Sequence, residues 1–344
     1  MKTSLKVMVI LAGLTSMNAG AHADAWNSVN DPAQMDSNYE YTLSKLPLEA
    51  QLENKPWSET YWETAIGSIN LRWNLPQPVG FNYELYTRDE LLHMTKDEIA
   101  TLSPSEKFDI YRSHYDYPLH TAVLRFANPH VATWRGICNG WSMSAIQYAE
   151  PGPKEVTNAD GIVIPFGASD IKALLSYYAQ FASGVQDVFV GAQCTNNGLF
   201  WGTSACKDIN PGAMHVVLAN QLGLKKQPVL MDRDPGAEIW NQPIFGYESK
   251  ILGSAQSSAA QGILVQTTIF YTDELQAPSW KPVNNTPQFT RSSMVSNYIL
   301  DLDASGRIVG GSYVNNSDHP DYFWLPKTPV EIDGDFTLLN TLLK

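Results

Sequence analysis

Residues 132–153 read ATWRGICNGWSMSAIQYAEPGP, and the fold prediction starts from the cysteine at their centre, Cys138. Gly136 and Gly140 loosen the backbone on either side of the thiol. The run WSMSAIQYA has helical character until Glu150-Pro151 ends it. The stretch therefore predicts a helix that begins at or near Cys138. Unpaired amides and the macrodipole at a helix N-terminus favour the thiolate, which is the nucleophilic form of cysteine.

The first 23 residues have the pattern of a secretory signal peptide. Lys2 and Lys6 precede an apolar run at 7–14, and small residues lead to Ala23. We expect cleavage after Ala23 and a secreted or periplasmic mature chain, and residues 1–23 are excluded from the fold prediction.

Three cysteines remain in the exported chain, an odd number for an oxidising compartment. Cys194 and Cys206 bracket a loop rich in turn residues, CTNNGLFWGTSAC. Pairing them closes a short loop and would stabilise the fold by about 3 kcal/mol. This predicted disulfide leaves Cys138 as the free thiol.

The net negative charge of the chain argues against binding to negatively charged partners. Without Lys2 and Lys6 the chain has 21 basic against 35 acidic residues, a net charge of −14. Nucleic acid and anionic membrane surfaces are therefore poor partners. No later stretch holds the 18 or more uncharged apolar residues of a membrane span, so the mature chain is not expected to be an integral membrane protein.

The N-terminal region, residues 24–110, is predicted to precede a catalytic domain at 111–344. Residues 24–82 are irregular and aromatic, and form either a wrap over the core or a pro-segment over the active site. From residue 87 the pattern is helical, and Ser103-Pro104-Ser105-Glu106 is a capping box with proline at the first helical position. We expect this helical part to be a scaffold.

Further along, a second helix is predicted over DIKALLSYYAQFA, capped by Ser169-Asp170. The segments that follow have strand character: MHVVLANQL, QPVLMD, GILVQTTIFYT, and a hairpin NYILDLDASGRIVGGSY that turns at residues 304–306. Helices come first and strands follow, so the predicted class is α+β.

A thiol nucleophile needs a base beside it and a group that orients the base. The histidines beyond the signal are at positions 93, 114, 120, 130, 215 and 319. We favour His215, because the predicted strand MHVVLANQL would project it from a sheet edge. If the following strand, QPVLMD, pairs with MHVVLANQL, Asp232 at its end lies beside His215 and can orient the imidazole ring. Asp234 and Asn241 are the alternatives for this third position.

Two stretches resemble a known family. WRGICNGWSMSAIQYAEP resembles the cysteine loop of the transglutaminase elicitor family, which occurs in oomycete plant pathogens and in bacteria. EIWNQPIFGY, residues 238–247, resembles the WNQP-containing peptide by which plants recognise the oomycete members. The helix at LSPSEKFDIY, the MHVVLANQLG segment and the IVGGSY hairpin extend the resemblance over roughly residues 50–330.

The resemblance implies a papain-like or transglutaminase-type core, in which a nucleophile helix packs on an antiparallel sheet. It also implies a Cys-His-Asp triad, which maps onto Cys138, His215 and Asp232. The implied partners are a glutamine-containing protein and a primary amine or lysine, joined by an isopeptide bond through a thioester. The sequence departs from the plant-recognised peptide after WNQP, with Phe245 in place of arginine, so recognition by plants is not expected.

Aromatic and amide side chains near the thiol have candidate roles in holding the oxyanion or the substrate. The backbone amide of Cys138 and the indole of Trp134 or Trp141 are candidate oxyanion donors. Trp240 would exclude water. Asn241 would orient His215 or secure a turn, and the tryptophans would alternatively be core residues.

No cofactor or metal site is predicted with certainty. Residues 301–306, DLDASG, imitate the start of a calcium loop, but the twelfth position is Ser312 and the flanks are strands, so a hairpin is preferred. Asp318-His319-Pro320-Asp321 is read as a turn because no partner cluster for a metal is evident. Calcium stimulation through dispersed acidic residues remains open.

Three functions compete. The first is a secreted transglutaminase, and the second is a papain-like cysteine protease or deamidase with the same triad. The third is a secreted recognition protein without catalytic activity, which the exposed-looking WNQP segment suggests.

Overall fold

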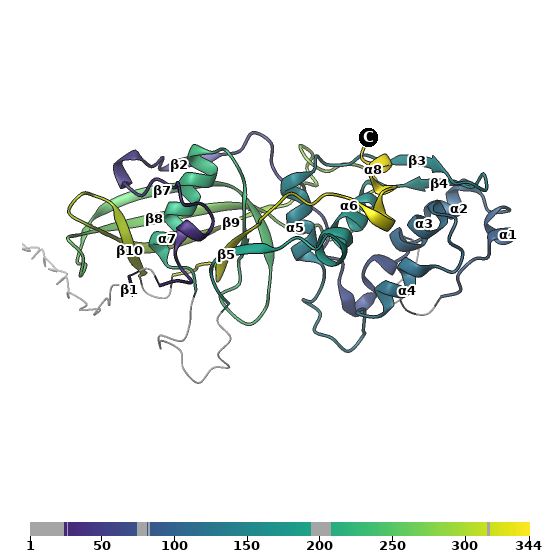
Figure 1. Ribbon diagram of the computed structural model, residues 1–344, viewed down its shortest axis with the longest axis horizontal. Helices are drawn as coiled ribbons and strands as arrows, with labels where there is room; N and C mark the ends of the chain where they lie inside the picture. The colour runs from purple at the N-terminus through teal and green to yellow at the C-terminus, as the bar shows by residue number, and fades with distance from the viewer. Residues whose placement is uncertain (1–23, 26, 74–80, 82, 194–207, 315–316) are drawn as a thin grey trace, which may run out of the picture.

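The structure is a computed structural model that describes residues 24–25, 27–73, 81, 83–193, 208–314 and 317–344. Figure 1 shows an elongated molecule in which a curved sheet occupies one half and helices the other. The α+β class with an antiparallel sheet is therefore confirmed.

The helices lie mostly in the first half of the chain. They are α1 (Arg88–Leu91), α2 (Lys96–Ala100), α3 (Pro104–Tyr111), α4 (Pro118–Leu124), α5 (Cys138–Gln147), α6 (Ala168–Tyr177), α7 (Pro211–Leu218) and α8 (Leu339–Leu342). Two helices continue into π-helical segments, α6 into η5 (Tyr178–Ala182) and α7 into η6 (Ala219–Leu224). Short 3-10 turns fill much of the N-terminal region and recur once near the C-terminus, namely η1 (Pro32–Gln34), η2 (Leu43–Lys45), η3 (Thr64–Ile66), η4 (Ser68–Asn70) and η7 (Gly334–Phe336).

Within the described residues the main sheet has nine strands in the order β1-β10-β9-β8-β7-β6-β11-β5, and β2 joins it by pairing with β7. All of the pairs are antiparallel. The strands are β1 (Asp24–Ala25), β2 (Glu49–Gln51), β5 (Asp187–Gly191), β6 (Val229–Asp232), β7 (Asn241–Ala255), β8 (Gln261–Thr272), β9 (Arg291–Leu302), β10 (Ile308–Tyr313) and β11 (Tyr322–Pro326). A separate hairpin, β3 (Lys154–Thr157) with β4 (Val163–Phe166), lies in the helical half.

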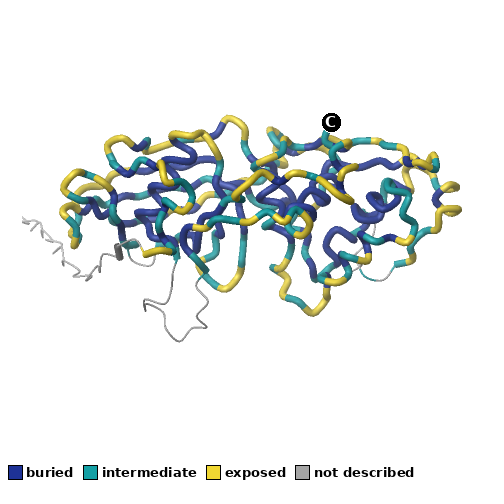
Figure 2. The backbone as a smooth tube through the Cα atoms, in the orientation of Figure 1, coloured by how far each residue is buried: buried dark blue, intermediate teal, exposed yellow. Residues whose placement is uncertain are grey.

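Two hydrophobic cores correspond to the two halves. One lies among helices α3 to α6 and the N-terminal region, and the other lies between the sheet and α7. Figure 2 shows buried backbone running through both halves. Helix α5 packs against α6 on one side and against β7 on the other, so it lies where the halves meet.

Several sequence predictions are confirmed. The capping box at the start of α3 is present, because the Ser103 side chain accepts from the amide of Glu106 and the Glu106 side chain accepts from the amide of Ser103. The strands predicted over QPVLMD and GILVQTTIFYT are β6 and β8, and the hairpin that turns before Gly306 is β9–β10. The helix expected from Ser169-Asp170 exists but begins earlier, at Ala168, with Gly167 as its N-cap.

The strand predicted over MHVVLANQL is wrong, because the segment is α7 and the start of η6. Asn210 caps this helix by accepting from the amide of Gly212 at 2.9 Å, and Pro211 occupies the first turn. All eight residues of α7 are buried. A segment that is buried on every side shows no period, so its pattern could not separate a strand from a helix.

The N-terminal region is built into both cores. Strand β2 pairs with β7, and Trp57 is 1% exposed and donates its indole proton to the carbonyl of Tyr148 at 3.0 Å. Two alternatives were predicted for residues 24–82, a wrap over the core and a pro-segment over the active site. This packing favours the first of them. In the part of the chain that is described, no helix is long and apolar enough to cross a membrane.

Candidate active site

Cys138 is the first residue of α5, as predicted. Ile137 before it has a non-helical backbone and makes no capping bond with its side chain, but Gln180 Oε1 accepts from the first-turn amide of Gly140 at 3.2 Å. The first-turn amides of a helix have no carbonyl partner within the helix, so those of Cys138 and Asn139 can bind a group at this end. The thiol therefore lies where a negative charge would be stabilised.

The two glycines near the thiol permit close packing rather than a loose backbone. A Cβ atom on Gly136 would lie 2.2 Å from the carbonyl oxygen of Tyr61, and one on Gly140 would lie 1.9 Å from the carbonyl oxygen of Ser176. The amide of Ile137 also donates to the Tyr61 carbonyl at 2.7 Å. The N-terminal region thus forms one wall of the site, directly before the thiol.

Asn241 faces the sulfur from the first position of β7. Its side-chain Nδ2 lies 4.0 Å from Cys138 Sγ, and the thiol itself points to the carbonyl oxygen of Ile239 at 3.6 Å. The indole of Trp324 on β11 donates to Asn241 Oδ1 at 2.7 Å. Because that bond occupies the carbonyl end of the amide, the NH2 end is directed to the sulfur. Of its two predicted roles, Asn241 therefore does not orient His215.

Asp232 is the carboxylate beside this pair. It is the last residue of β6 and lies opposite Asn241 on β7 and opposite Tyr322 on β11. Its Oδ1 accepts from the amide of Trp240 at 2.8 Å, while its Oδ2 is buried without a hydrogen-bond partner among the described residues. Asp234 instead binds the amide of Gly236 in the next turn. Asp232 is thus the better placed of the two aspartates predicted for the third position.

Burial dominates the titration of the site. Burial, together with the charges of Glu274 and Asp232, raises the pKa of Cys138 to about 11, although the hydrogen bonds from Asn241 lower it. Cys138 is therefore a neutral thiol at rest and not the thiolate expected from the sequence. The effect of burial on its pKa outweighs the effect of the helix N-terminus. Burial also raises the pKa of Asp232 to about 7, so this carboxyl group can accept or return a proton near neutral pH.

The structure does not bring His215 to Cys138. His215 lies in α7, which covers β9 and β10, whereas α5 packs on β6 and β7. Its Nδ1 is 2.8 Å from the hydroxyl of Tyr298, and burial alone lowers its pKa to about 4. The argument that placed it here required a strand at 214–222. With a helix there, that argument no longer holds.

The three tryptophans singled out by sequence have different places. Trp141 is fully buried and donates its indole proton to the carbonyl of Trp57 at 3.1 Å, so it is part of the core and not an oxyanion donor. Trp134 is half-buried under Arg135. Trp240 packs edge-on against Tyr61 with 5.3 Å between ring centroids. Of the three, Trp240 thus lies against the wall of the site.

The WNQP segment is largely buried, so the impression from the sequence that it is exposed is wrong. Residues 241–247 are all buried in β7, between β6 and β8. Cys194 and Cys206 lie outside the described residues, as does the signal peptide. Among the described residues there is no group of three or more His, Cys, Asp or Glu side chains that could hold a metal ion.

Four residues of the site were missed by sequence reasoning: Tyr61, Glu274, Tyr322 and Trp324. Glu274 had a signal, since Asp273-Glu274 directly follows a predicted strand. Trp324 and Tyr322 lie in the apolar run YFWLP, which reads only as a buried strand. Nothing in the sequence near Tyr61 points to Cys138, because their proximity is set by the path of the N-terminal region.

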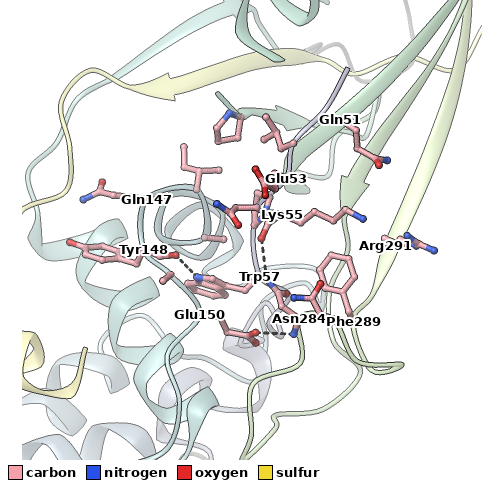
Figure 3. A pocket seen from close by; sticks show the side chains of 18 of the residues that line it. Gln51, Glu53, Lys55, Trp57, Gln147, Tyr148, Glu150, Asn284, Phe289 and Arg291 are labelled. Atoms are coloured by element: carbon pink, nitrogen blue, oxygen red, sulfur yellow. Dashed lines mark hydrogen bonds between the residues drawn. The ribbon is translucent and has the colours of Figure 1, made fainter. Parts of the chain in front are cut away.

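A cavity of about 1190 Å³ lies away from the thiol, at the C-terminal end of α5, between Gln147, the segment from Gln51 to Trp57, and the loop around Asn284. Figure 3 shows Glu150 among the residues that line it, where its carboxylate accepts from the backbone amide of Asn284 at 2.8 Å. This cavity and Cys138 lie at opposite ends of the same helix.

A thiol at the first residue of a helix, packed on antiparallel strands that present a carboxylate and a carboxamide, defines a transglutaminase-type α+β core. A family model described as transglutaminase elicitor matches residues 127–277 and 259–334. The chain therefore belongs to the transglutaminase elicitor family.

A solved structure gives the same fold. The crystal structure of the GP42 transglutaminase from Phytophthora sojae is similar with a TM-score of 0.69 and 23% identity, over 93% of this chain and 98% of that chain. No curated protein matches the sequence.

The bond from Trp324 to Asn241 predicts a change in thiol reactivity. In Trp324→Phe the Asn241 amide loses its anchor, so its donation to the sulfur weakens and the pKa of Cys138 rises. A rise of about one unit lowers the thiolate fraction about tenfold. Alkylation of Cys138 by iodoacetamide at pH 8, followed by peptide mass, should be about tenfold slower. Phe189→Leu, which removes a ring that packs on both Trp324 and Tyr322 but leaves the bond from Trp324 to Asn241 in place, should change the rate less than twofold. Equal rates in wild type and Trp324→Phe would contradict this role.

Proposed function

We propose that this chain is an exported protein-glutamine acyltransferase of the transglutaminase type. Cys138 is the nucleophile, glutamine side chains are the acyl donors, and lysine side chains or other primary amines are the acceptors. The observation that carries the proposal is the position of Cys138 as the first residue of α5, with Asn241 and Asp232 around its sulfur. Export rests on the signal-like residues 1–23.

Each residue of the site has its own role in the proposed reaction. Asp232 takes the thiol proton through its unpartnered Oδ2 while Asn241 stabilises the sulfur. The thiolate attacks the glutamine carboxamide, and the proton held by Asp232 returns to the leaving nitrogen as ammonia. A primary amine then attacks the thioester, forms the isopeptide bond and releases the cysteine. The amide of Cys138 at the helix start is available to the oxyanion.

The test is to follow two products of a glutamine-containing protein: ammonia released, and a labelled primary amine incorporated. The expected result is that the chain produces both and that Cys138→Ala produces neither. Amine incorporation by Cys138→Ala at the wild-type rate would refute the proposal.

The alternative functions give other results. A papain-like protease would cleave peptide bonds without incorporating amine, and a deamidase would release ammonia without incorporation. A recognition protein without activity would give no product. Because burial raises the pKa of Cys138 to about 11, slow alkylation of this thiol no longer indicates a merely structural cysteine. Product assays are therefore the decisive ones.

Asp232 and His215 can be compared directly as the proton acceptor. Asp232→Asn should lower the rate of ammonia release by about 10²- to 10⁴-fold, the range of general acid-base catalysis. In wild type the rate should rise as pH increases through about 7, because the carboxyl must be ionised to accept the proton. Asp232→Asn should lose this rise.

His215→Asn is the matched variant, since an amide can still bond to the Tyr298 hydroxyl. Its rate per folded molecule should stay within about threefold of wild type, because His215 lies in α7 against β9 and β10, whereas Cys138 lies in α5 against β6 and β7. A loss of 10² or more in His215→Asn, with Asp232→Asn near wild type, would restore the histidine as the base.

A further inference from the structure

A second, smaller pocket of about 460 Å³ lies beside the thiol, and we name it the Tyr61–Trp240 pocket. Its wall comes from Thr60 to Leu71 of the N-terminal region, from Trp240, and from Glu274 to Pro278 after β8. Ile137, directly before Cys138, donates its amide to the carbonyl of Tyr61 at 2.7 Å, and the thiol lies 3.6 Å from the carbonyl oxygen of Ile239, directly before Trp240. The pocket therefore adjoins the sulfur.

The lining of this pocket suits a cation. Tyr61 and Trp240 meet at an interplanar angle of 66°, and aromatic faces attract ammonium groups. Glu63 and Glu274 add carboxyl groups, and none of the described residues in the lining is basic. A neutral carboxamide could donate hydrogen bonds to the acids but carries no charge, whereas an ammonium group gains electrostatic attraction from both the rings and the acids.

Two residues that line the pocket have buried polar atoms without a hydrogen-bond partner among the described residues, Trp62 Nε1 and Ser68 Oγ. Of the two, only the Ser68 hydroxyl can accept a hydrogen bond from an ammonium group, because an indole N–H is a donor only. Both also have positive φ values, 50° and 53°, in the left-handed region that non-glycine residues seldom adopt. Strained backbone and unsatisfied buried groups gather at ligand sites, and here they coincide.

Glu274 is held in place at the border between pocket and thiol. Gln242 of β7, which is fully buried, donates from Nε2 to Glu274 Oε1 at 2.6 Å. Burial, and then the neighbouring Asp273, raise the pKa of Glu274 to about 8. The carboxyl group can therefore both attract a cation and exchange a proton in the pH range in which primary amines react.

We propose that the Tyr61–Trp240 pocket binds the acyl acceptor as a primary ammonium group on an unbranched chain, such as a lysine side chain, with Glu274 receiving its proton. This inference rests on the proposed function. The ammonium gives one proton to the Glu274 carboxylate and becomes a neutral amine. The amine attacks the thioester carbon, the C–S bond breaks, and the second amine proton goes to the departing thiolate. Glu274 then returns its proton to water.

The binding test does not depend on catalysis. Calorimetry with Cys138→Ala at pH 8.5 would compare pentylamine with 1-pentanol, which has the same length and no charge. We expect pentylamine to bind at least about tenfold more tightly, and Glu274→Gln to remove that preference. Glu53→Gln, an exposed carboxylate outside this pocket, should leave both affinities unchanged. Equal binding of the two probes, or an unaltered preference in Glu274→Gln, would overturn the proposal.

The kinetic test separates the pocket from the chemistry at Cys138. For a glutamine peptide, the ratio of amine incorporation to hydrolysis should fall at least about tenfold in Glu274→Gln through a higher KM for the amine. Removing the carboxylate should also lower the pKa of Cys138, which an alkylation pH profile measures. If the wild-type chain releases no ammonia from the peptide, the proposed function fails, while calorimetry still decides on the pocket. An unchanged ratio in an active Glu274→Gln enzyme would exclude the acceptor role.

Discussion

Cys138→Ala is expected to lose at least about 10⁴-fold in both ammonia release and amine incorporation, because removal of a nucleophile eliminates the covalent route. The fold should persist. Only one sulfur atom is removed, and alanine favours a helix more than cysteine does. Loss of activity with an unchanged urea midpoint would therefore assign the chemistry to the thiol.

The control for that experiment lies one turn further along α5. Ser142→Ala removes a hydroxyl group that donates to the carbonyl of Asn139 at 2.9 Å. This variant should keep rates within about threefold of wild type, since helix hydroxyls that bond locally contribute about 1 kcal/mol or less. A comparable loss in Ser142→Ala would indicate damage to α5 rather than loss of a nucleophile.

Lys172→Met is expected to destabilise the chain by about 3–5 kcal/mol, the cost of leaving buried charges without their partner. Lys172 on α6 is fully buried, 2.6 Å from Glu150 Oε1 and 3.8 Å from Glu59 Oε2. It also donates to the carbonyl of Ser58 at 2.8 Å. One cation thus joins α6, the end of α5 and the N-terminal region, which is why urea unfolding should register its loss.

The loss should depend on pH in a defined direction. Burial raises the pKa of Glu59 to about 7 even beside Lys172, above the ordinary value near 4.3. A carboxyl group with a raised pKa in the folded state reduces stability as pH rises from its unfolded pKa to its folded pKa. The deficit of Lys172→Met should therefore be smaller at pH 5 than at pH 7.5, and Glu59→Gln added to Lys172→Met should recover part of it.

Lys96→Met is the matched control. Lys96 and Glu155 form an ion pair at 2.5 Å, but their side chains are 51% and 55% exposed. Exposed pairs contribute about 0–1 kcal/mol, so this variant should unfold close to wild type. Equal destabilisation by Lys96→Met and Lys172→Met would contradict the view that the buried cation holds α6, the segment after α5 and the N-terminal region together.

The N-terminal region offers a related comparison. If it is a removable pro-segment, limited proteolysis between residues 60 and 110 should raise activity. The packing of Trp57 and the buried contacts of Glu59 lead us to expect a loss of stability instead, without a gain in rate. Activity before and after a single nick would decide between these outcomes.

Local signals were enough for a large part of the fold. The capping box before α3, the helix at Cys138 and the β9–β10 turn each depend on residues within about one or two turns of chain. Alternation and β-branched residues likewise identified β6 and β8. These elements report local backbone preference, which a single sequence carries.

Helix α7, which the sequence pattern predicts as a strand, shows the limit of prediction from local pattern. Its residues are all buried, so no polar face marks its period, and the apolar run 214–222 fits a strand as well as a helix. This difference changes the candidate site, because the predicted place of His215 beside Asp232 depends on that strand. The local signal for the helix is Asn210 as the N-cap, followed by Pro211 in the first turn.

By itself the sequence determined the thiol: Cys138 at the start of a helix, with Asp232 at the end of a strand. Only the tertiary structure decided what surrounds the sulfur. Asn241, Trp324, Glu274 and Tyr61 reach it from separate strands and from the N-terminal region, more than 60 positions away from Cys138 in every case. Such contacts are set by strand order and by burial in a shared core, and these depend on the whole chain rather than on any one stretch.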